Sequence, residues 1–489
     1  MIQLIDVSFR YKGAAELNLK KISLHIKKGE CVLISGRSGC GKTTILRLIN
    51  GLIPHYYEGE IEGSVLIEGK NIETMEMYEI AEHVGTIYQN PRAQFFNIDS
   101  DSEILFGIEN LAYPRKKLKE RFEKTVQETG VKELLGKNLF WLSGGEKQKI
   151  AFASVYAMQP EIYLMDEPSA NLDAAAVKKL QNQISRLKKQ GKTVVITEHR
   201  LHYLRNLVDR ILYVENGEIQ REYLAEQFFN LSVKERIEKG LRTVNVMEND
   251  VLVKSKEDKI LAENHSSIFM QIQNVGVSYQ KQEIIHNISF NAKAGEVIAV
   301  TGKNGAGKST LVEALCGLHE IKTGNITING RTCKEKQRCQ AGYMVFQDVD
   351  FQLFADSVRR ECTYGLKNIK QEQVSQILEE LKLEELEDKH PALLSGGQKQ
   401  RLAVAVSLLC GKEILIFDEP TSGLDYDNMC RVSSLIQELS QKGKIIFIVT
   451  HDYELVCRVC DRMLLLDRGT LIDDIKACNN LEQIKEILV

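Results

Sequence analysis

The distribution of apolar and polar positions along the chain predicts strands that alternate with helices. Apolar and polar side chains alternate over residues 2–11, which is typical of a half-buried strand. Short apolar, β-branched runs at residues 31–35, 162–166 and 193–197 have the length of buried strands, and a longer helical pattern covers residues 177–189. This alternation predicts an α/β fold with a largely parallel sheet and helices on both of its faces.

The second half of the chain repeats the pattern of the first. Residues 2–11 align with residues 270–279, and a glycine-rich segment at Gly36 recurs at Gly302. Three further motifs, which are described below, then recur in the same order. The second copy of each lies 252 residues after the first. The second half is 14 residues shorter between the glycine-rich segment and the first of these three motifs, and length variation of this kind marks surface insertions. We therefore predict two related α/β domains.

The boundaries of the repeat define three segments. We predict domains at residues 1–225 and 269–489, with residues 226–268 between them. This connecting segment is rich in Lys, Glu and Asn and has only short apolar patches, which favours a helix followed by a charged, semi-flexible linker. The alternative, a small third domain, would be unusually short.

Composition and charge are those of an ordinary globular protein. The 489 residues include 64 Lys and Arg against 67 Asp and Glu, so the formal net charge of −3 gives no attraction to nucleic acid. No apolar run approaches the ~20 residues of a membrane-spanning helix. The N-terminus leads directly into a strand pattern without the features of a secretion signal. We therefore expect a cytoplasmic chain that does not itself cross a bilayer.

Each half contains the motif Gly-x-x-x-x-Gly-Lys-Ser/Thr between a predicted strand and a predicted helix. In this context the backbone N–H groups wrap a phosphate, the Lys neutralises β- and γ-oxygens, and the hydroxyl binds Mg²⁺. The alternative is a glycine-rich turn, but two matches in register are rarely due to chance. The predicted nucleotide-binding residues are Gly36, Gly39, Gly41, Lys42, Thr43 and Thr44, and in the second half Gly302, Gly305, Gly307, Lys308, Ser309 and Thr310.

Two adjacent carboxylates end an apolar strand in each half. They are Asp166 and Glu167 in the first half and Asp418 and Glu419 in the second. The Asp is suited to hold Mg²⁺ through water, and the Glu to polarise the water that attacks the γ-phosphate. A solvated turn is the usual alternative for a lone Asp-Glu pair, but here a phosphate loop precedes the pair in both halves.

The segments LSGGE and LSGGQ support two compatible interpretations. Ser143 with Glu146, and Ser395 with Gln398, form the pattern of a helix capping box. The intervening glycines leave backbone N–H groups uncovered at a positive helix end, which also makes an anion site. No anion partner is expected within the same half, because the glycine-rich loop of that half already holds the triphosphate.

Taken in order, these motifs resemble those of ATP-binding-cassette (ABC) ATPases, twice over. The LSGG element separates this family from other phosphate-loop ATPases. The resemblance implies two nucleotide-binding domains, each with an N-terminal antiparallel β region and a helical subdomain, that pack head to tail as an intramolecular pseudo-dimer. The first composite ATP site would contain Lys42, Thr43, Gln89, Asp166, Glu167 and His199, completed by Ser395, Gly396 and Gly397. The second would contain Lys308, Ser309, Gln347, Asp418, Glu419 and His451, completed by Ser143, Gly144 and Gly145.

Further positions carry over from the family. Tyr11 and Tyr279 resemble the aromatic that stacks on adenine, although half-buried packing is the default for a strand tyrosine. Gln89 and Gln347 resemble the glutamine that contacts Mg²⁺ and senses the partner protein. The expected Mg²⁺ ligands are therefore Thr43, Gln89, Asp166, Ser309, Gln347 and Asp418.

The resemblance also assigns an aspartate and a histidine in each half. Asp173 and Asp425 resemble the loop that reports across the dimer. His199 and His451 each follow their Asp by 33 residues, and this equal spacing favours contact with the γ-phosphate over a structural role. The expected catalytic residues are Glu167, Glu419, His199 and His451. Because both halves retain the full set, we expect both sites to hydrolyse ATP, with Glu146 tuning rather than abolishing one of them.

The segments QNPRAQFF and QDVDFQLF suggest what the ATPase drives. They resemble the ATPases of energy-coupling-factor (ECF) transporters, the vitamin and metal-ion importers of prokaryotes. The resemblance implies integral membrane partners, a transmembrane coupling protein and a substrate-binding protein, at the cytoplasmic face of the membrane. Exposed Phe95, Phe96, Leu353 and Phe354 would form grooves for helices of the partner, the alternative being buried packing.

Two other functions stay open. A tandem sugar-importer ATPase is disfavoured because both catalytic glutamates are present and the segments after Gln89 and Gln347 differ. A soluble translation-factor-like tandem ABC ATPase is disfavoured because that group resembles basic proteins with a long charged inter-domain helix.

Overall fold

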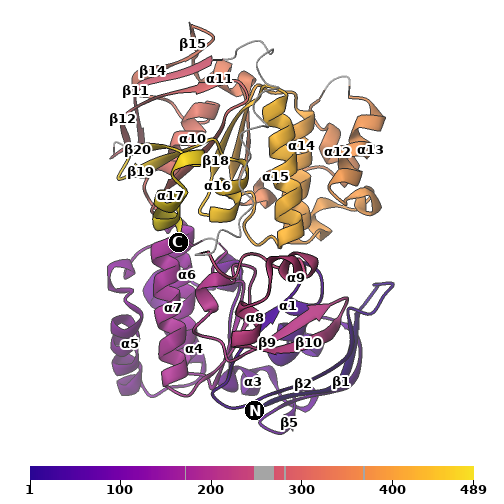
Figure 1. Ribbon diagram of the computed structural model, residues 1–489. Coiled ribbons are helices and arrows are strands. Elements are labelled where there is room, and N and C mark those ends of the chain that lie inside the picture. Colours follow the sequence, from indigo (N-terminus) through magenta and orange to yellow (C-terminus); the bar gives the residue numbers. More distant parts are fainter. Residues whose placement is uncertain (171, 247–268, 280–281, 367–368) are drawn as a thin grey trace. The chain divides into compact units, whose positions relative to one another are not determined.

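The computed structural model describes residues 1–170, 172–246, 269–279, 282–366 and 369–489 (Figure 1). The chain divides into two compact units, Met1–Asn245 and Val246–Val489. Each unit contains one four-stranded and one six-stranded sheet. Among the described residues, no helix combines the length and the apolar character needed to span a membrane.

The six-stranded sheet of the first unit is largely parallel. Its strand order is β10-β9-β3-β8-β7-β6, and only the β9–β10 pair is antiparallel. The apolar runs predicted at residues 31–35, 162–166 and 193–197 form β3, β7 and β8 with those bounds, and their apolar side chains are buried. The strands are β3 (Cys31–Ser35), β6 (Val84–Ile87), β7 (Ile162–Asp166), β8 (Thr193–Thr197), β9 (Arg210–Glu215) and β10 (Glu218–Leu224).

The second sheet of the first unit is antiparallel, as predicted. It has the order β2-β1-β4-β5, and its strands alternate between buried and exposed positions because only one face packs on the core. The strands are β1 (Ile2–Tyr11), β2 (Leu19–Ile26), β4 (Gly59–Ile67) and β5 (Lys70–Asn71).

Helices flank the main sheet and also form a separate group. The group of α4, α5 and α6 is the predicted helical subdomain (Figure 1). Buried Arg121 ties it together, because its guanidinium donates to the carbonyls of Tyr156 and Ala157 near the end of α6. The helices are α1 (Lys42–Ile49), α2 (Leu52–His55), α3 (Met77–His83), α4 (Ser100–Asn110), α5 (Arg115–Thr129), α6 (Gly144–Met158), α7 (Ala174–Lys189), α8 (Ala225–Phe229) and α9 (Val233–Glu238).

The second unit repeats both sheets and the helical subdomain. The sheet orders are β16-β17-β18-β13-β19-β20 and β12-β11-β14-β15, and α12 and α13 lie beside α14 (Figure 1). The strands are β11 (Phe269–Tyr279), β12 (Gln282–Lys293), β13 (Val297–Gly302), β14 (Thr323–Ile328), β15 (Arg331–Thr332), β16 (Gly342–Val345), β17 (Ile414–Asp418), β18 (Ile445–Val449), β19 (Arg462–Asp467) and β20 (Thr470–Lys476). The helices are α10 (Lys308–Cys316), α11 (Glu335–Ala341), α12 (Val358–Thr363), α13 (Gln371–Glu380), α14 (Gly396–Leu409), α15 (Tyr426–Gln441), α16 (Tyr453–Val459) and α17 (Leu481–Leu488).

The first unit extends beyond residue 225, where the sequence places the end of the domain. The side chains of Phe228, Phe229, Leu241 and Val244 are buried in the core of the first unit, which therefore includes residues up to Asn245. Residues 247–268 of the predicted linker lie outside the described residues.

Candidate functional site

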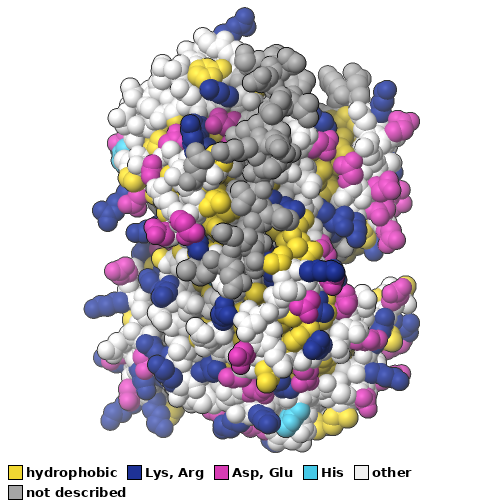
Figure 2. All heavy atoms as spheres, viewed as in Figure 1, with side chains coloured by type: hydrophobic (Ala, Val, Ile, Leu, Met, Phe, Trp, Pro, Cys, Tyr) yellow, Lys and Arg dark blue, Asp and Glu magenta, His cyan; other side chains and the backbone are white. Residues whose placement is uncertain are grey.

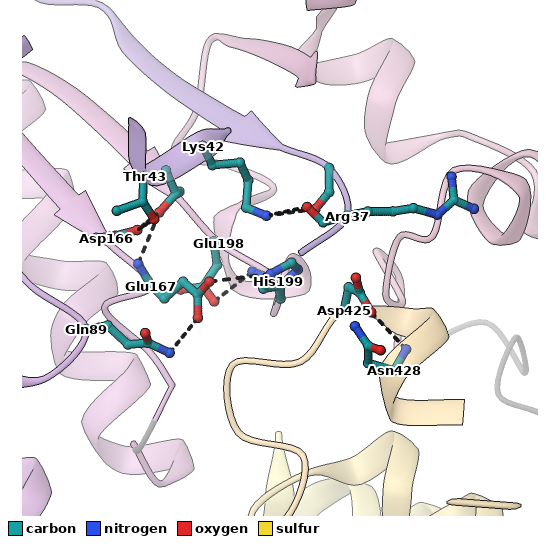
Figure 3. A network of polar contacts seen from close by, with 12 residues as sticks. Arg37, Lys42, Thr43, Gln89, Asp166, Glu167, Glu198, His199, Asp425 and Asn428 are labelled. Carbon is teal, nitrogen blue, oxygen red and sulfur yellow. Dashed lines mark hydrogen bonds and ion pairs between the residues drawn. The ribbon is translucent and has the colours of Figure 1, made fainter. Parts of the chain in front are cut away.

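The glycine-rich loop of the first unit connects β3 to α1. Gly36 has a φ of 151°, and a Cβ there would lie 2.1 Å from the carbonyl oxygen of Val214, so this position requires glycine. The ammonium of Lys42 donates to the carbonyls of Gly36 (3.0 Å) and Arg37 (2.9 Å), which places it inside the loop (Figure 3). No side chain caps the N-terminus of α1. The backbone N–H groups and Lys42 therefore make a positive cradle that fits a phosphate.

The second unit builds the same loop between β13 and α10. A Cβ on Gly302 would lie 2.1 Å from the carbonyl oxygen of Leu466. The ammonium of Lys308 donates to the carbonyls of Gly302 (2.7 Å) and Lys303 (3.1 Å). The geometry around Lys42 is thus reproduced.

Polar side chains from four segments meet at the end of β7 in the first unit (Figure 3). The Thr43 hydroxyl lies 3.3 Å from Asp166 Oδ1, and the Gln89 amide donates to Glu167 Oε2 at 2.8 Å. The buried Nε2 atom of His199 lies 3.4 Å from Glu167 Oε1 and makes no hydrogen bond among the described residues. The structure thus brings together five predicted site residues next to the phosphate cradle.

The electrostatics of this cluster fit a cation. Burial raises the pKa of Asp166, and the charge of Glu167 raises it further. A carboxylate in this environment is stabilised when a positive ion is bound. Hydroxyl, amide and carboxylate oxygens at Thr43, Gln89 and Asp166 are the donors that Mg²⁺ prefers.

The second unit has the corresponding cluster at the end of β17. The Ser309 hydroxyl donates to Asp418 at 3.1 Å, and burial raises the Asp418 pKa to about 6. His451 Nε2 lies 3.9 Å from Glu419 Oε1, and the Thr450 hydroxyl lies 3.4 Å from Glu419 Oε2.

Both glutamates have a left-handed backbone conformation. The φ angle is 46° at Glu167 and 50° at Glu419, a region that non-glycine residues seldom adopt. In each case the backbone N–H donates to the neighbouring strand, at the carbonyl of Thr197 (2.9 Å) or Val449 (2.8 Å). Such backbone conformations cost about 1–3 kcal/mol and concentrate at active sites.

The two LSGG elements form the predicted capping boxes. Ser143 and Glu146 exchange hydrogen bonds at the start of α6, and Ser395 and Gln398 do the same at the start of α14. In the first unit the Ser143 hydroxyl also lies 2.9 Å from the Glu146 carboxylate. A Cβ on Gly144 or on Gly396 would meet nothing within 4 Å, so both helix ends are open. Gly145 and Gly397 continue the first turns of these helices.

The remaining predicted residues have identifiable local roles. Asp173 and Asp425 are the N-caps of α7 and α15. The hydroxyl of half-buried Tyr11 accepts a hydrogen bond from Arg47 at 2.9 Å, whereas Tyr279 is 58% exposed. Gln347 is exposed in the second unit. Thr44 and Thr310 lie in the first turns of α1 and α10.

One buried carboxylate in each unit was not predicted. Glu198 precedes His199 and accepts hydrogen bonds from the backbone N–H of Ser169 (3.3 Å) and from the Tyr203 hydroxyl (2.9 Å). Asp452 follows His451 and accepts a hydrogen bond from the hydroxyl of Thr421 (2.6 Å), which is the counterpart of Ser169. Each carboxylate therefore holds the segment after the Asp-Glu pair in place. In the first unit this carboxylate precedes the histidine in the sequence, and in the second unit it follows the histidine. The segments TEHR and THDY each contain a carboxylate next to the histidine, but at positions that do not align.

A second glutamine in each segment after Gln89 and Gln347 was also missed. Gln94 accepts a hydrogen bond from the backbone N–H of Tyr88 at 3.4 Å. Gln352 accepts one from the N–H of Phe346 at 3.2 Å. Each thus holds the residue before the predicted Mg²⁺ ligand in place.

The apolar pairs after these glutamines are only partly exposed. Phe96 and Phe354 are 77% and 72% exposed, but Phe95 and Leu353 pack against the cores of their units. The prediction that all four are exposed is therefore wrong for Phe95 and Leu353, whose side chains point toward the core.

Two buried glutamates anchor the exposed aromatics. Glu103 accepts from the backbone N–H groups of Phe96 (3.0 Å) and Asn97 (2.9 Å). Glu361 accepts from those of Phe354 (2.8 Å) and Ala355 (2.7 Å). Charged acceptors make strong hydrogen bonds, so the backbone beneath each exposed aromatic is held firmly.

The duplicated fold, phosphate loops, carboxylate pairs and LSGG elements define the class of ABC ATPases. The family model for the ABC transporter matches residues 19–170 and 285–422, and the chain belongs to this family. It is an ATPase with two nucleotide-binding domains in tandem.

Known proteins resemble the chain over nearly its full length. Two proteins of Treponema denticola that carry the name ABC transporter ATP-binding protein are 45% and 39% identical. The first match covers 97% of both chains, and the second covers 99% of this chain and 98% of the relative. A solved structure of ribosome-bound archaeal Pelota and ABCE1 matches with a TM-score of 0.72, covering 98% of this chain and 80% of that chain at 22% identity. At this identity the structural likeness shows the fold alone.

Proposed function

We propose that this ATPase drives an ECF-type importer of a vitamin or metal ion, bound at the cytoplasmic face of the membrane to a transmembrane coupling protein and a substrate-binding protein. One observation carries the proposal. Each unit holds an aromatic side chain, Phe96 or Phe354, in solvent on a backbone segment that a buried glutamate anchors. A rigidly presented apolar side chain is suited to receive a helix of another protein.

The proposed chemistry follows from the clusters at the strand ends. Lys42 and Lys308 bind the phosphates, and Glu167 and Glu419 orient and polarise the attacking water. His199 and His451 would contact the γ-phosphate. Mg²⁺, held by Thr43, Gln89 and Asp166 and by their counterparts Ser309, Gln347 and Asp418, would neutralise charge on the phosphates.

The proposed coupling uses both halves. Each LSGG element completes the ATP site of the other half, so ATP binding closes the pair and hydrolysis reopens it. This cycle would reorient the membrane partners. The name shared by the Treponema denticola relatives supports a role in transport.

Affinity purification of the full chain from native membranes tests the proposal. Recovery of a multispanning membrane protein is expected, and its recovery should fall at least tenfold in a Phe96→Ser, Phe354→Ser variant. Ile472→Ser on β20 is the matched control, because Ile472 is also an exposed apolar side chain. Recovery of ribosomal RNA in place of a membrane protein would overturn the proposal. Uptake of candidate vitamins and metal ions in cells lacking the protein would then identify the substrate.

A further inference from the structure

The two segments that carry the exposed aromatics have opposite charge. We call residues 89–98 the first docking segment and residues 347–356 the second docking segment. Arg92 of the first occupies the position of Asp350 in the second, and Ile98 occupies the position of Asp356. All four side chains are exposed. The second segment also contains Asp348, so its charge is −3 against +1 for the first.

The helix that follows each phosphate loop also differs in charge between the two units. Arg47 on α1 corresponds to Glu313 on α10. The Arg47 guanidinium lies 4.2 Å from the ring centroid of Tyr57. Burial raises the pKa of Tyr88, the residue before the first docking segment, and the charge of Arg47 opposes that shift. Glu313 lies 3.1 Å from the imidazole Nε2 of His319.

Equivalent lysines of the two units lie beside side chains of opposite charge. Lys147 on α6 corresponds to Lys399 on α14. Burial lowers the pKa of Lys147, and the guanidinium of Arg92 lowers it further. In the second unit Lys399 instead forms an ion pair with Asp350 at 2.6 Å. The equivalent lysines therefore lie beside opposite charges, Arg92 in the first docking segment and Asp350 in the second.

The surrounding helical subdomains extend this difference. Residues 89–142 contain nine Lys and Arg against eight Asp and Glu, whereas residues 347–394 contain six against eleven. Figure 2 shows basic side chains over the region of α5 in the first unit and acidic ones over the region of α12 and α13 in the second. Each surface thus combines an exposed aromatic with a different sign of charge.

We infer that the two units bind two different segments of the membrane partner: the first takes an amphipathic helix that carries acidic side chains, and the second takes one that carries basic side chains. The inference rests on the proposed function. An apolar anchor at Phe96 or Phe354 supplies the common part of the contact, and complementary charge sets which segment goes to which unit. Juxtaposed like charges would disfavour the reverse assignment.

Site-specific cross-linking tests this assignment. A photoreactive phenylalanine analogue replaces Phe96 or Phe354 in the full chain, which is then irradiated in native membranes. Mass spectrometry of the cross-linked peptides should identify two different partner segments, with net negative charge for position 96 and net positive charge for position 354. Cross-links from both positions to one segment, or to segments of the opposite charges, would overturn the inference alone. Cross-links to no membrane protein at either position would overturn the proposed function and the inference with it.

Charge variants provide a second measurement. Arg92→Glu should lower the recovery of the membrane partner at least tenfold at low salt, while Arg92→Lys keeps it. Asp350→Lys should act in the same way at the second unit, with Asp350→Glu as its control. Equal unfolding midpoints of the variants show that folding is intact. Equal recovery with Arg92→Glu and Arg92→Lys would overturn the charge assignment.

Discussion

At the scale of single residues, the glutamates that follow β7 and β17 are the proposed general bases. Glu167 lies between the Gln89 amide and the His199 ring, and its backbone conformation fixes its direction. We expect Glu167→Gln with Glu419→Gln to lower steady-state ATP hydrolysis about 10²- to 10⁴-fold, the usual contribution of a general base. Phosphate release measures it, with the exposed Glu226→Gln as the matched control. Undiminished turnover in the double variant would contradict the assignment.

The buried carboxylate Glu198 makes a separate prediction. It accepts hydrogen bonds from three backbone N–H groups and the Tyr203 hydroxyl. Glu198→Gln replaces one acceptor oxygen by a donor, so we expect the free energy of unfolding of the first unit to fall by about 1–3 kcal/mol. Urea unfolding measures the change. A stability equal to that of Glu226→Gln would show that the carboxylate does not hold the segment.

The sequence points to most residues of the candidate site, and for one exception, Glu198, the cause can be identified. Lys42, Asp166, Glu167 and His199 lie in motifs whose spacing alone indicates chemistry, and the structure brings them together. Glu198 was missed because in the second half the corresponding hydrogen bond is made by Asp452, which lies at a different position of the repeat. An alignment of the two halves therefore does not pair the two carboxylates. A contact that persists while its residue moves is visible only in three dimensions.

At the scale of elements, prediction was most accurate for the buried parallel strands. Both faces of these strands are covered, so their sequences are continuous apolar runs with sharp ends. The end of the first unit was placed too early because α8 and α9 are short and polar on one side. Only the burial of Phe228 and Phe229 in the core reveals that they belong to it.

The anchor on α4 predicts a local change in dynamics. Glu103→Ala removes the acceptor of the Phe96 and Asn97 N–H groups, so we expect their hydrogen exchange to accelerate roughly tenfold or more. Mass spectrometry of the peptide that contains them measures the rate. Glu109→Ala on the same helix, where the side chain is exposed, should leave the rate unchanged. Slow exchange in both variants would mean that other contacts hold the segment.

At the scale of the whole molecule, the single tryptophan provides a probe of the proposed head-to-tail pairing. Trp141 lies two residues before Ser143 and is 87% exposed. In the Glu167→Gln, Glu419→Gln variant we expect ATP and Mg²⁺ to shift its emission to shorter wavelength, because closure in the proposed head-to-tail pairing would bury the indole. Adding Lys308→Ala should remove the shift, and adding Lys42→Ala should largely preserve it. Equal loss in both would contradict the pairing of Trp141 with the second phosphate loop.

The carboxylates next to the two histidines, which lie at positions of the repeat that do not align, also bear on whether the two halves of the gene can exchange sequence. Recombination at the codons of His199 and His451 would produce one half with Glu and Asp on either side of the histidine, and another with Thr and Arg there. The first product would bury two negative charges around one hydroxyl-bearing residue, and the second would leave that residue without its carboxylate partner. We expect the free energy of unfolding of such products to be lower than that of the natural chain. The displaced carboxylates therefore make these two segments non-interchangeable, although the fold around them is the same.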